Sequence, residues 1–269
     1  MKRPLARTMI FLLFVFGSLT AQTDYSAAIK ADFNHFFGVG KALLTAPLRI
    51  DQRQAQRWAL IAGITLALTP VDDDVHAFAL NHQSSGGDNL FAIDRYYGHI
   101  YSFTLPVGIY LYGLVFHKDR VRQTGLKTAE SFLYAGAITQ TLKILIGRRR
   151  PENGDGQYFF KPFQWTDDRY QAFPSGHATL SFAMSTVLAK SVDNIYWKIF
   201  WYGSAVLVSG ARMYHERHWP SDVFFGAVIG YSVGSFVARH DQPGSAEPVS
   251  VALLPLPSQG AALTLKIPF

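Results

Sequence analysis

The stretch YQAFPSGHATLSFAMSTVLA, residues 170–189, contains no Asp, Glu, Lys or Arg. Pro174 is suited to the first turn of a helix, because proline has a fixed φ and no N–H that needs a partner. We therefore expect a helix that begins at Pro174, with the backbone N–H groups of Ser175, Gly176 and His177 free at its positive end. The apolar residues that follow indicate a helix that is buried on most of its sides.

Similar uncharged stretches recur along the chain and predict the fold class. The stretches are residues 58–71, 96–116, 131–142, 170–189, 199–211 and 223–238. They predict an all-α fold, a bundle of about six core helices. A helix that crosses a bilayer needs about 20 apolar residues, with about 17 as the lower limit, and only the second and fourth stretches are that long. We expect the bundle to be embedded in a membrane, with a bundle enclosed by protein as the alternative.

The composition excludes several classes of protein. Asp, Glu, Lys and Arg make up 16% of the 269 residues, against roughly 25% in an average soluble domain. A hydrophobic share of 49% argues against disorder, which combines low hydrophobicity with high charge. Because the chain has no cysteine, disulfides, thiolate catalysis and cysteine-ligated metals are excluded. The net charge of +6 suits nucleic acid, anionic lipid or a phosphorylated substrate, and does not choose among them.

The first residues resemble an export signal. Lys2, Arg3 and Arg7 precede an apolar centre at residues 9–16, and small residues surround Ala21. This order is typical of a secretory signal peptide, with an uncleaved membrane anchor as the alternative. Either segment would direct the chain to the cell envelope.

We divide the chain into four parts. Residues 1–21 are the signal peptide or anchor, residues 22–56 an amphipathic N-terminal segment, residues 57–240 the helical-bundle domain and residues 241–269 a C-terminal tail. We interpret residues 72–95 as a loop region whose acidic run at residues 72–74 is solvated, with a cation site that includes His76 as the alternative. Alternating apolar residues in the tail allow a weak hairpin, although a tail without regular structure is the favoured expectation.

Positive charges give a provisional orientation in the membrane. If all six stretches cross, Lys118, Arg120 and Arg122 follow the second stretch on one side, which the positive-inside tendency makes cytoplasmic. The opposite loops, which contain Arg148–Arg150, Lys161, Arg169 and Arg217, then face the periplasm, and the charge bias holds only if these residues have another role. The same arrangement places Arg53 and Arg57 in the cytoplasm, although a cleaved signal would deliver the new N-terminus outside. The number of crossings is therefore open.

Three groups of polar residues interrupt or border the apolar stretches. The first contains Lys143 and Arg150-Pro151, the second is Pro174–His177, and the third contains Arg212, His218 and Asp222. In a bundle of alternating helix directions, the end of the third stretch, the start of the fourth and the junction of the fifth and sixth lie at the same end. We therefore expect the three groups to converge on one site.

The residue types of this site suit a phosphate group. Lysine and arginine match phosphate oxygens, and a helix N-terminus binds anions. His218 and Asp222 are four residues apart, so the carboxylate can bond one ring nitrogen and leave the other as a nucleophile. His177 can give a proton to the leaving alkoxide. Substitution at phosphorus would then pass through a phosphohistidine, with the cations in the role that Mg²⁺ has elsewhere.

A known family has a signature with this order and spacing. The motifs are Lys143-(six residues)-Arg150-Pro151, Pro174-Ser175-Gly176-His177, and Arg212-(five residues)-His218-(three residues)-Asp222. Together they resemble the signature of the type 2 phosphatidic acid phosphatase / vanadium haloperoxidase superfamily, over about residues 128–240. Residues 37–49 and the short first stretch look more like the envelope-associated bacterial branch.

The resemblance implies an all-helical core and metal-independent hydrolysis of phosphate monoesters or diphosphates. It implies that His218 is the nucleophile, Asp222 its partner and His177 the general acid. It assigns the contacts with substrate phosphate to Lys143, Arg150, Ser175, Gly176 and Arg212. The family usually has serine where this chain has Ala211, so one hydroxyl contact is lost.

Residues between the motifs have more than one interpretation. We interpret Arg148 and Arg149, which lie outside the signature, as contacts with solvent or lipid headgroups. The loop at residues 152–173 contains seven aromatic residues, Tyr158, Phe159, Phe160, Phe163, Trp165, Tyr170 and Phe173. They form either a rim that holds an acyl or isoprenyl chain, or a cover packed on the bundle.

The leading hypothesis is a phosphatase of lipid phosphates or diphosphates in the inner membrane, with its site facing the periplasm. We expect no metal ion, no cofactor and no nucleic acid partner. The expected partners are membrane lipids and a phosphorylated lipid substrate, and the sequence does not identify a protein partner. The mean hydropathy of only +0.09 supports a soluble periplasmic acid phosphatase of broad specificity as an alternative. A vanadium-dependent haloperoxidase and a pseudoenzyme that binds lipid phosphate without turnover are further alternatives.

Overall fold

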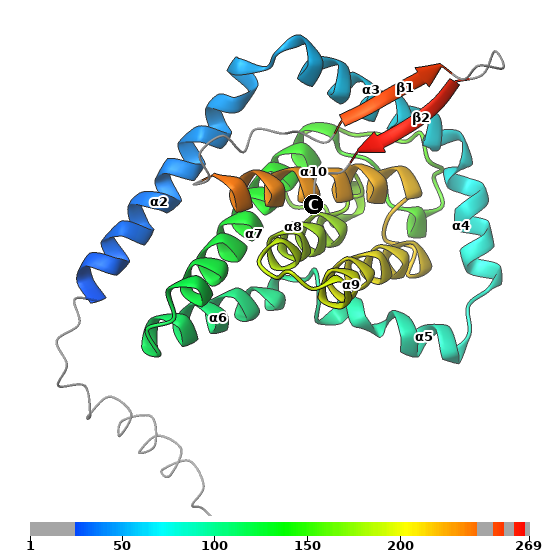
Figure 1. Cartoon of the computed structure of the whole chain (residues 1–269). Helices are drawn as coiled ribbons and strands as arrows, with labels where there is room; N and C mark the ends of the chain where they lie inside the picture. The colour runs from blue at the N-terminus through cyan, green and yellow to red at the C-terminus, as the bar shows by residue number, and fades with distance from the viewer. Residues whose placement is uncertain (1–24, 241–249, 256–260, 267–269) are drawn as a thin grey trace, which may run out of the picture. The chain divides into compact units, whose positions relative to one another are not determined.

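The computed structural model of the protein describes residues 25–240, 250–255 and 261–266 (Figure 1). The predicted signal or anchor at residues 1–21 lies outside the described residues. The chain divides into two compact units, Met1–Gly38 and Val39–Phe269, and each is described by itself. The first unit contains most of helix α2, Tyr25–Thr45. The second unit contains all three groups of predicted site residues.

The second unit is a helical bundle, which confirms the predicted fold class. Its helices are α3 (Gln52–Leu68), α4 (Asp72–Asn81), α5 (Ser85–Phe91), α6 (Thr104–Val115), α7 (Asp119–Ile146), α8 (Gly176–Lys190), α9 (Ile195–Tyr214) and α10 (Pro220–Arg239). Each predicted apolar stretch contains one helix or part of one. The bundle therefore has about eight helices rather than six, because α4 and α5 occupy the segment expected to be a loop.

The C-terminal tail contains regular structure, so the favoured expectation of an irregular tail is wrong. Strand β1 (Ser250–Pro255) pairs antiparallel with β2 (Ala261–Lys266), with Val251 opposite Leu265. The alternation of apolar residues at every second position is the pattern that a strand requires. This is the hairpin that the alternating apolar residues of the tail predict as the alternative.

Local signals in the sequence set the helix ends around the site. Helix α8 begins at Gly176 rather than Pro174, and Ser175 is its N-cap, with its Oγ 3.5 Å from the N–H of Ala178. Helix α10 has Pro220 in its first turn, as proline prefers. Gly147 follows the last residue of helix α7 and caps it, with φ at +62° and its N–H donating to Lys143 O at 2.9 Å. A Cβ at Gly147 would lie 1.8 Å from Lys161 O, so only glycine fits this turn.

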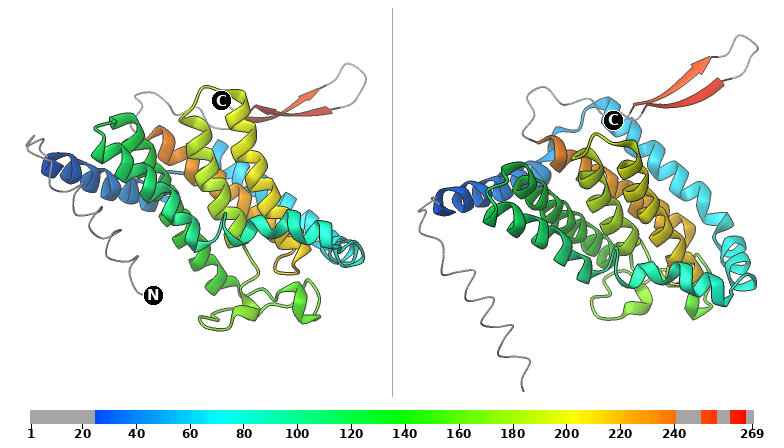
Figure 2. Two further views of the ribbon diagram at one scale, coloured as in Figure 1. Left: turned by 90° about the horizontal axis from the view of Figure 1, so that it is seen from below. Right: turned by 60° about the horizontal axis from the view of Figure 1, so that its bottom comes forward.

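Helices α8 and α10 lie in close contact, which places their N-terminal ends together (Figures 1 and 2). Gly226, Gly230 and Gly234 share one face of α10 because they are four residues apart. A Cβ at these positions would lie 2.5 Å from Ser175 O, 2.2 Å from Thr179 O and 2.6 Å from Ala183 O. The backbones of the two helices therefore touch along three turns.

Two apolar clusters hold the bundle together. The first contains Val39, Ala135, Ala183, Ile229, Val233 and Val237 and joins α7, α8 and α10. The second is centred on Phe132, Met184 and Leu188, with side chains from α6 and α9 packed against it. Helices α7 and α8 contribute to both clusters and form the centre of the second unit.

Helix lengths differ from those predicted from the apolar stretches. Helix α6 has 12 residues and α8 has 15, so neither of the two stretches judged long enough forms a helix of spanning length. Among the described helices, α10 is the one long and apolar enough to cross a membrane, and half of its most apolar 18-residue window is buried in the protein. A buried core helix satisfies the same criterion, so length and composition alone are weak support for a crossing.

Candidate active site

The three groups of predicted site residues lie together at one end of the bundle. The N–H of Ser175, at the start of α8, donates to Asp222 O in the first turn of α10 at 3.0 Å. A Cβ at Gly176 would lie 3.7 Å from Lys143 Cε on α7. Residues separated by up to 79 positions in the sequence are therefore neighbours. Alternating helix directions bring them together, as the sequence analysis expected.

His218 lies in the turn between α9 and α10 and is only 3% exposed. Its Nδ1 is 2.6 Å from the carbonyl oxygen of Ala172. Because a carbonyl oxygen can only accept, Nδ1 carries the ring proton, and the lone pair of the neutral imidazole is at Nε2. The loop that precedes α8 thus selects the tautomer of His218.

The surroundings of His218 favour its neutral form. Burial lowers the pKa of His218 well below its usual value, and the positive charges of Lys143, Arg150 and Arg212 lower it further. Each cation makes a second positive charge on the imidazole unfavourable. His218 is therefore an unprotonated nitrogen base at neutral pH, among three cations.

Asp222 is fully buried beside His218, but it does not make the hydrogen bond that the sequence analysis expected. Its Oδ2 is 3.9 Å from His218 Nδ1, beyond hydrogen-bond distance. The same oxygen accepts from the N–H of Trp219 at 2.8 Å, and Oδ1 accepts from Arg148 Nη1 at 2.6 Å. The carboxylate therefore acts on His218 through its charge, while Ala172 O accepts the hydrogen bond from Nδ1–H.

Each cation of the site has a partner that fixes its position. Arg212 donates to Asp94 Oδ2 at 2.6 Å, and Arg150 donates to Asp168 Oδ1 at 2.6 Å. Lys143 Nζ donates to Gln171 O. Arg212 Nε is buried and has no hydrogen-bond partner among the described residues. A buried donor without a partner is costly, and an anion in the site would satisfy it.

His177 occupies the second position of α8, within the N-terminal turn. Its ring centroid is 5.5 Å from that of His99, which precedes α6. A Cβ at Gly98, where φ is +77°, would lie 2.7 Å from His177 O. The segment before α6 therefore passes directly over the start of α8.

Two interpretations of charged residues outside the signature are wrong. Arg148 was expected to contact solvent or headgroups, but it is 2% exposed and pairs with both Asp222 and Asp72. Asp72 was expected in a solvated loop, but it is fully buried in the first turn of α4. His76 pairs with Glu216 at 3.1 Å rather than joining Asp72 in a cation site.

Sequence reasoning also missed Asp94, the partner of Arg212. Nothing distinguishes Asp94, Asp72 or Arg148 from other charged residues along the chain, because a sequence pattern reports periodicity and not which distant residue becomes a neighbour. Arg149, in contrast, is only partly buried and contacts Tyr170 Oη at 2.7 Å and Asp155 at 2.5 Å.

The aromatic residues of the loop at residues 152–173 differ in exposure. Five of its aromatic residues are exposed, with exposed fractions from 43% to 72%: Tyr158, Phe159, Phe160, Phe163 and Trp165. Tyr170 is buried, and Phe173 stacks on Phe225 of α10 with ring centroids 5.0 Å apart. Phe173 therefore packs on the bundle, and a rim formed by the five exposed residues stays a prediction.

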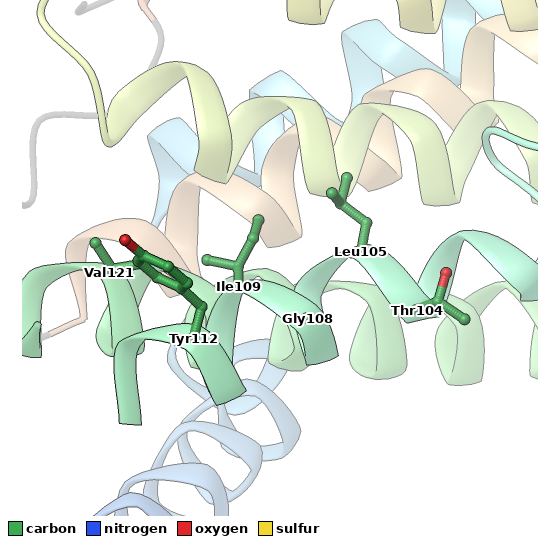
Figure 3. A pocket seen from close by; sticks show the side chains of 6 residues that line it. All are labelled: Thr104, Leu105, Gly108, Ile109, Tyr112 and Val121. Carbon is green, nitrogen blue, oxygen red and sulfur yellow. The ribbon is translucent and has the colours of Figure 1, made fainter. Parts of the chain in front are cut away.

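A shallow pocket of about 460 Å³ lies elsewhere, on α6 and α7 (Figure 3). Its lining residues are Thr104, Leu105, Gly108, Ile109, Tyr112 and Val121. This lining carries no charged or nucleophilic group other than the Thr104 and Tyr112 hydroxyls, and it includes none of the predicted site residues. The pocket is therefore separate from the candidate active site.

Comparisons with known proteins agree with the geometry. Residues 124–243, somewhat less than half of the chain, match the family model described as PAP2 superfamily. The segment contains all eight predicted site residues.

Two relatives share part of the sequence. An undecaprenyl-diphosphatase from Sulfolobus acidocaldarius is 32% identical over 134 residues, which are 50% of this chain and 61% of that protein. A lipid A 1-phosphatase from Porphyromonas gingivalis is 31% identical over 81 residues, 29% of this chain and 18% of that protein. The chain thus matches less than two thirds of the length of either relative.

A solved structure shares the fold. The crystal structure of a transmembrane PAP2 type phosphatidylglycerolphosphate phosphatase from Bacillus subtilis aligns with a TM-score of 0.55 and 21% identity, over 71% of this chain and 96% of that chain. At this identity the likeness concerns the helical fold alone.

Proposed function

We propose that the chain is a metal-independent phosphatase of lipid phosphate monoesters or diphosphates, which works through a phosphohistidine at His218. The observation that carries the proposal is the state of His218: a buried, neutral imidazole with its Nδ1 proton on Ala172 O, among three cations. A nucleophilic nitrogen next to fixed positive charge suits an attack on a phosphate group.

In the first step, the lone pair of His218 Nε2 forms a bond to phosphorus. The bond between phosphorus and the leaving oxygen breaks, and its electron pair stays on that oxygen. Burial and the nearby cations lower the pKa of His177, so its ring is neutral in the free site and takes up a proton from the monoprotonated phosphate as the substrate binds. His177 then gives this proton to the leaving oxygen, which becomes an alcohol or a phosphate. In the second step, His177 takes a proton from water, the water oxygen bonds to phosphorus and the phosphorus–nitrogen bond breaks. Inorganic phosphate leaves, and the lone pair returns to Nε2.

The charged residues have separate roles in this scheme. Lys143, Arg150 and Arg212 stabilise negative charge on the transferring group, together with the N–H groups at the start of α8 around Ser175 and Gly176. The phosphorylated imidazole is positively charged, and the Asp222 carboxylate 3.9 Å from Nδ1 offsets that charge. Arg212 Nε, which has no partner among the described residues, is the donor that we assign to a phosphate oxygen.

A lipid substrate is supported by three observations. The two relatives are named for lipid diphosphate and lipid A phosphate hydrolysis. The exposed aromatic residues at positions 158–165 lie in the loop that begins after the Arg148–Arg150 run, and aromatic side chains favour the membrane interface. The basic, apolar N-terminus is typical of export. We infer a protein of the inner membrane with its site facing the periplasm.

The test is phosphate release from a panel of lipid phosphates in detergent: phosphatidate, phosphatidylglycerol phosphate, undecaprenyl diphosphate and lipid A. We expect turnover of at least one substrate, loss of at least about 10³-fold in kcat for His218→Ala, and full activity in EDTA. His82→Ala is the control, because His82 is an exposed histidine outside the site.

Four outcomes would contradict the proposal. Strong inhibition by EDTA would exclude a metal-free mechanism, and an active His218→Ala variant would exclude this nucleophile. A wild-type protein that binds lipid phosphate without turnover would indicate the non-catalytic alternative, and bromide oxidation with added vanadate would indicate the haloperoxidase.

A further inference from the structure

A buried group of polar residues lies behind the candidate nucleophile. It consists of Arg148, Asp72, Ser221 and Asp222, which we call the Arg148 cluster; all four have exposed fractions of 2% or less. Arg148 follows α7, Asp72 begins α4, and the other two are in the first turn of α10. Three separate parts of the chain therefore meet at one guanidinium group.

The guanidinium group of Arg148 donates five hydrogen bonds, as many as it has N–H groups. Nη1 donates to Asp222 Oδ1 at 2.6 Å and Ser221 Oγ at 2.7 Å, and Nη2 donates to Asp72 Oδ2 at 2.8 Å. Nε and Nη2 also donate to Gln157 O, at 3.0 and 2.8 Å. Because the guanidinium is planar and rigid, these bonds fix its orientation. Lysine has the same charge but could not span the three partners.

Asp72 binds the same helix start from the other side. Its Oδ1 accepts from the N–H of Ser221 at 3.0 Å, and its Oδ2 accepts from Ser221 Oγ at 2.5 Å. The N–H of Ser221 is one of the free donors of the first turn of α10, so Asp72 acts as a capping residue supplied by another helix. Asp72 lies outside residues 124–243, the segment that matches the family.

The cluster determines where the carboxylate of Asp222 can lie. Arg148 holds Oδ1, and the N–H of Trp219 holds Oδ2 at 2.8 Å. With both oxygens occupied, the carboxylate stays 3.9 Å from His218 Nδ1, and Ala172 O keeps the proton bond. If Arg148 were absent, Oδ1 would lose its partner and the carboxylate could rotate away from this arrangement.

We propose that Arg148 and Asp72 are positioning residues of the phosphatase: they hold Asp222 at a fixed distance from His218, so that its charge stabilises the phosphorylated imidazole. This inference rests on the proposed function. We assign the contacts with the substrate phosphate to Lys143, Arg150 and Arg212. Neither Arg148 nor Asp72 makes such a contact. The expected defect is therefore slow chemistry with intact phosphate binding.

The experiment compares Arg148→Lys, Asp72→Asn and Ser221→Ala with the wild type, using one substrate that the wild-type protein hydrolyses. For the first two we expect kcat to fall by about tenfold or more, with KM and the inhibition constant of inorganic phosphate within about twofold of wild type. Vanadate, which mimics five-coordinate phosphorus bonded to the histidine, should bind more weakly in proportion to the loss of kcat. Ser221→Ala removes only the bridging hydroxyl and should show a smaller loss in the same direction.

Matched controls separate positioning from a general disturbance of the loops. Arg149→Lys changes the neighbouring arginine, whose partners are Tyr170 and Asp155. Glu216→Gln removes the ion pair with His76, which ties the same helix α4 to the same turn without touching Asp222. Both controls should keep wild-type kcat and vanadate inhibition, and thermal midpoints show that each variant is folded.

Each outcome decides the inference. A folded Arg148→Lys or Asp72→Asn variant with wild-type kcat would overturn it, as would a loss of kcat matched by an equal loss of phosphate affinity. If Arg148→Lys does not fold, Asp72→Asn and Ser221→Ala decide; unfolding of all three would make the cluster structural only. A wild-type protein without phosphatase activity would overturn the proposed function together with this inference, whereas an active wild type with unaffected variants would overturn this inference alone.

Discussion

At the residue scale, the chemistry of the site depends on the proton of His218. Ala172 O accepts that proton at Nδ1 with a distance of 2.6 Å, and burial with the surrounding cations keeps the ring neutral. A backbone carbonyl cannot take the proton away, in contrast to a carboxylate. The tautomer is thus fixed by the backbone of the loop before α8, and Asp222 contributes its charge.

We expect the contribution of His177 to kcat to depend on the leaving group of the substrate. A general acid contributes about 10²- to 10⁴-fold when the leaving oxygen is a poor leaving group. We expect His177→Asn to lower kcat by about 10²-fold or more for an alkyl phosphate, and far less for an aryl phosphate with an acidic phenol. The measurement is kcat for a series of phosphate esters of increasing leaving-group pKa.

The slope of this series distinguishes acid catalysis from a structural role. His177→Asn should show a steeper dependence on leaving-group pKa than the wild type. An equal loss for every ester would contradict the assignment of His177 as the proton donor.

The site residues that the sequence predicted are those whose chemistry and spacing are local. Lys143, His177 and His218 stand out because each is polar or basic at the border of an apolar stretch. Arg148 was misinterpreted, although it lies two positions from Arg150, because side-chain burial depends on partners that are distant in the sequence. Asp72 is 150 positions from Asp222, and no periodicity connects them.

At the scale of elements, the contact between α8 and α10 positions the site. The glycine face of α10 lets the backbones touch, which brings Ser175 N to Asp222 O. Larger side chains on this face would separate the two helix starts that carry His177 and Asp222. Small residues in an apolar stretch indicate close packing, but they do not say which helix is the partner.

Gly230→Ala is expected to destabilise the protein. The new methyl carbon would lie 2.2 Å from Thr179 O, a backbone atom that cannot move freely, and such overpacking typically costs about 1–3 kcal/mol. The measurement is the thermal or denaturant midpoint of the purified variant.

Gly203→Ala is the matched control for this substitution. Gly203 lies within α9, is exposed and has nothing within 4 Å of the new methyl position. Alanine is favoured over glycine in a helix by roughly 1 kcal/mol, so this variant should be as stable as the wild type or more so. A stable Gly230→Ala variant would show that α8 and α10 are less closely packed than the structure indicates.

The helices themselves were predictable where the hydrophobic pattern is long. All six apolar stretches contain helix, but their charged flanks are helical too, so α7 extends over 28 residues. The acidic run and glycines of residues 72–95 are typical of loops and predict one there. In the structure, the acidic residues begin α4, where the helix dipole favours negative charge.

At the scale of the whole molecule, association with the membrane is the property that the proposed function requires. Among the described helices, α10 alone meets the length and hydropathy criteria for a crossing. We expect the full-length protein to stay with the membrane fraction through an alkaline carbonate wash and to need detergent for release, because apolar surface holds an embedded bundle in lipid.

Release of the protein by carbonate alone would contradict membrane embedding. It would favour the soluble periplasmic phosphatase of broad specificity, and activity toward water-soluble phosphate esters at least equal to that toward lipid phosphates would support the same alternative. Retention of an inactive His218→Ala variant in the membrane fraction is the control, since localisation does not depend on catalysis.

The sequence alone determined the helical fold class, the three motifs and the type of anion that they suit, because these depend on residue chemistry and short-range spacing. The tertiary structure decided which charges are buried and which atoms they meet. In the structure, Ala172 O rather than Asp222 accepts the hydrogen bond from His218 Nδ1. Arg148 donates to both Asp222 and Asp72. The physical reason is that a buried charge is stable only with its partners, and these partners come from helices that the chain folds together from distant positions.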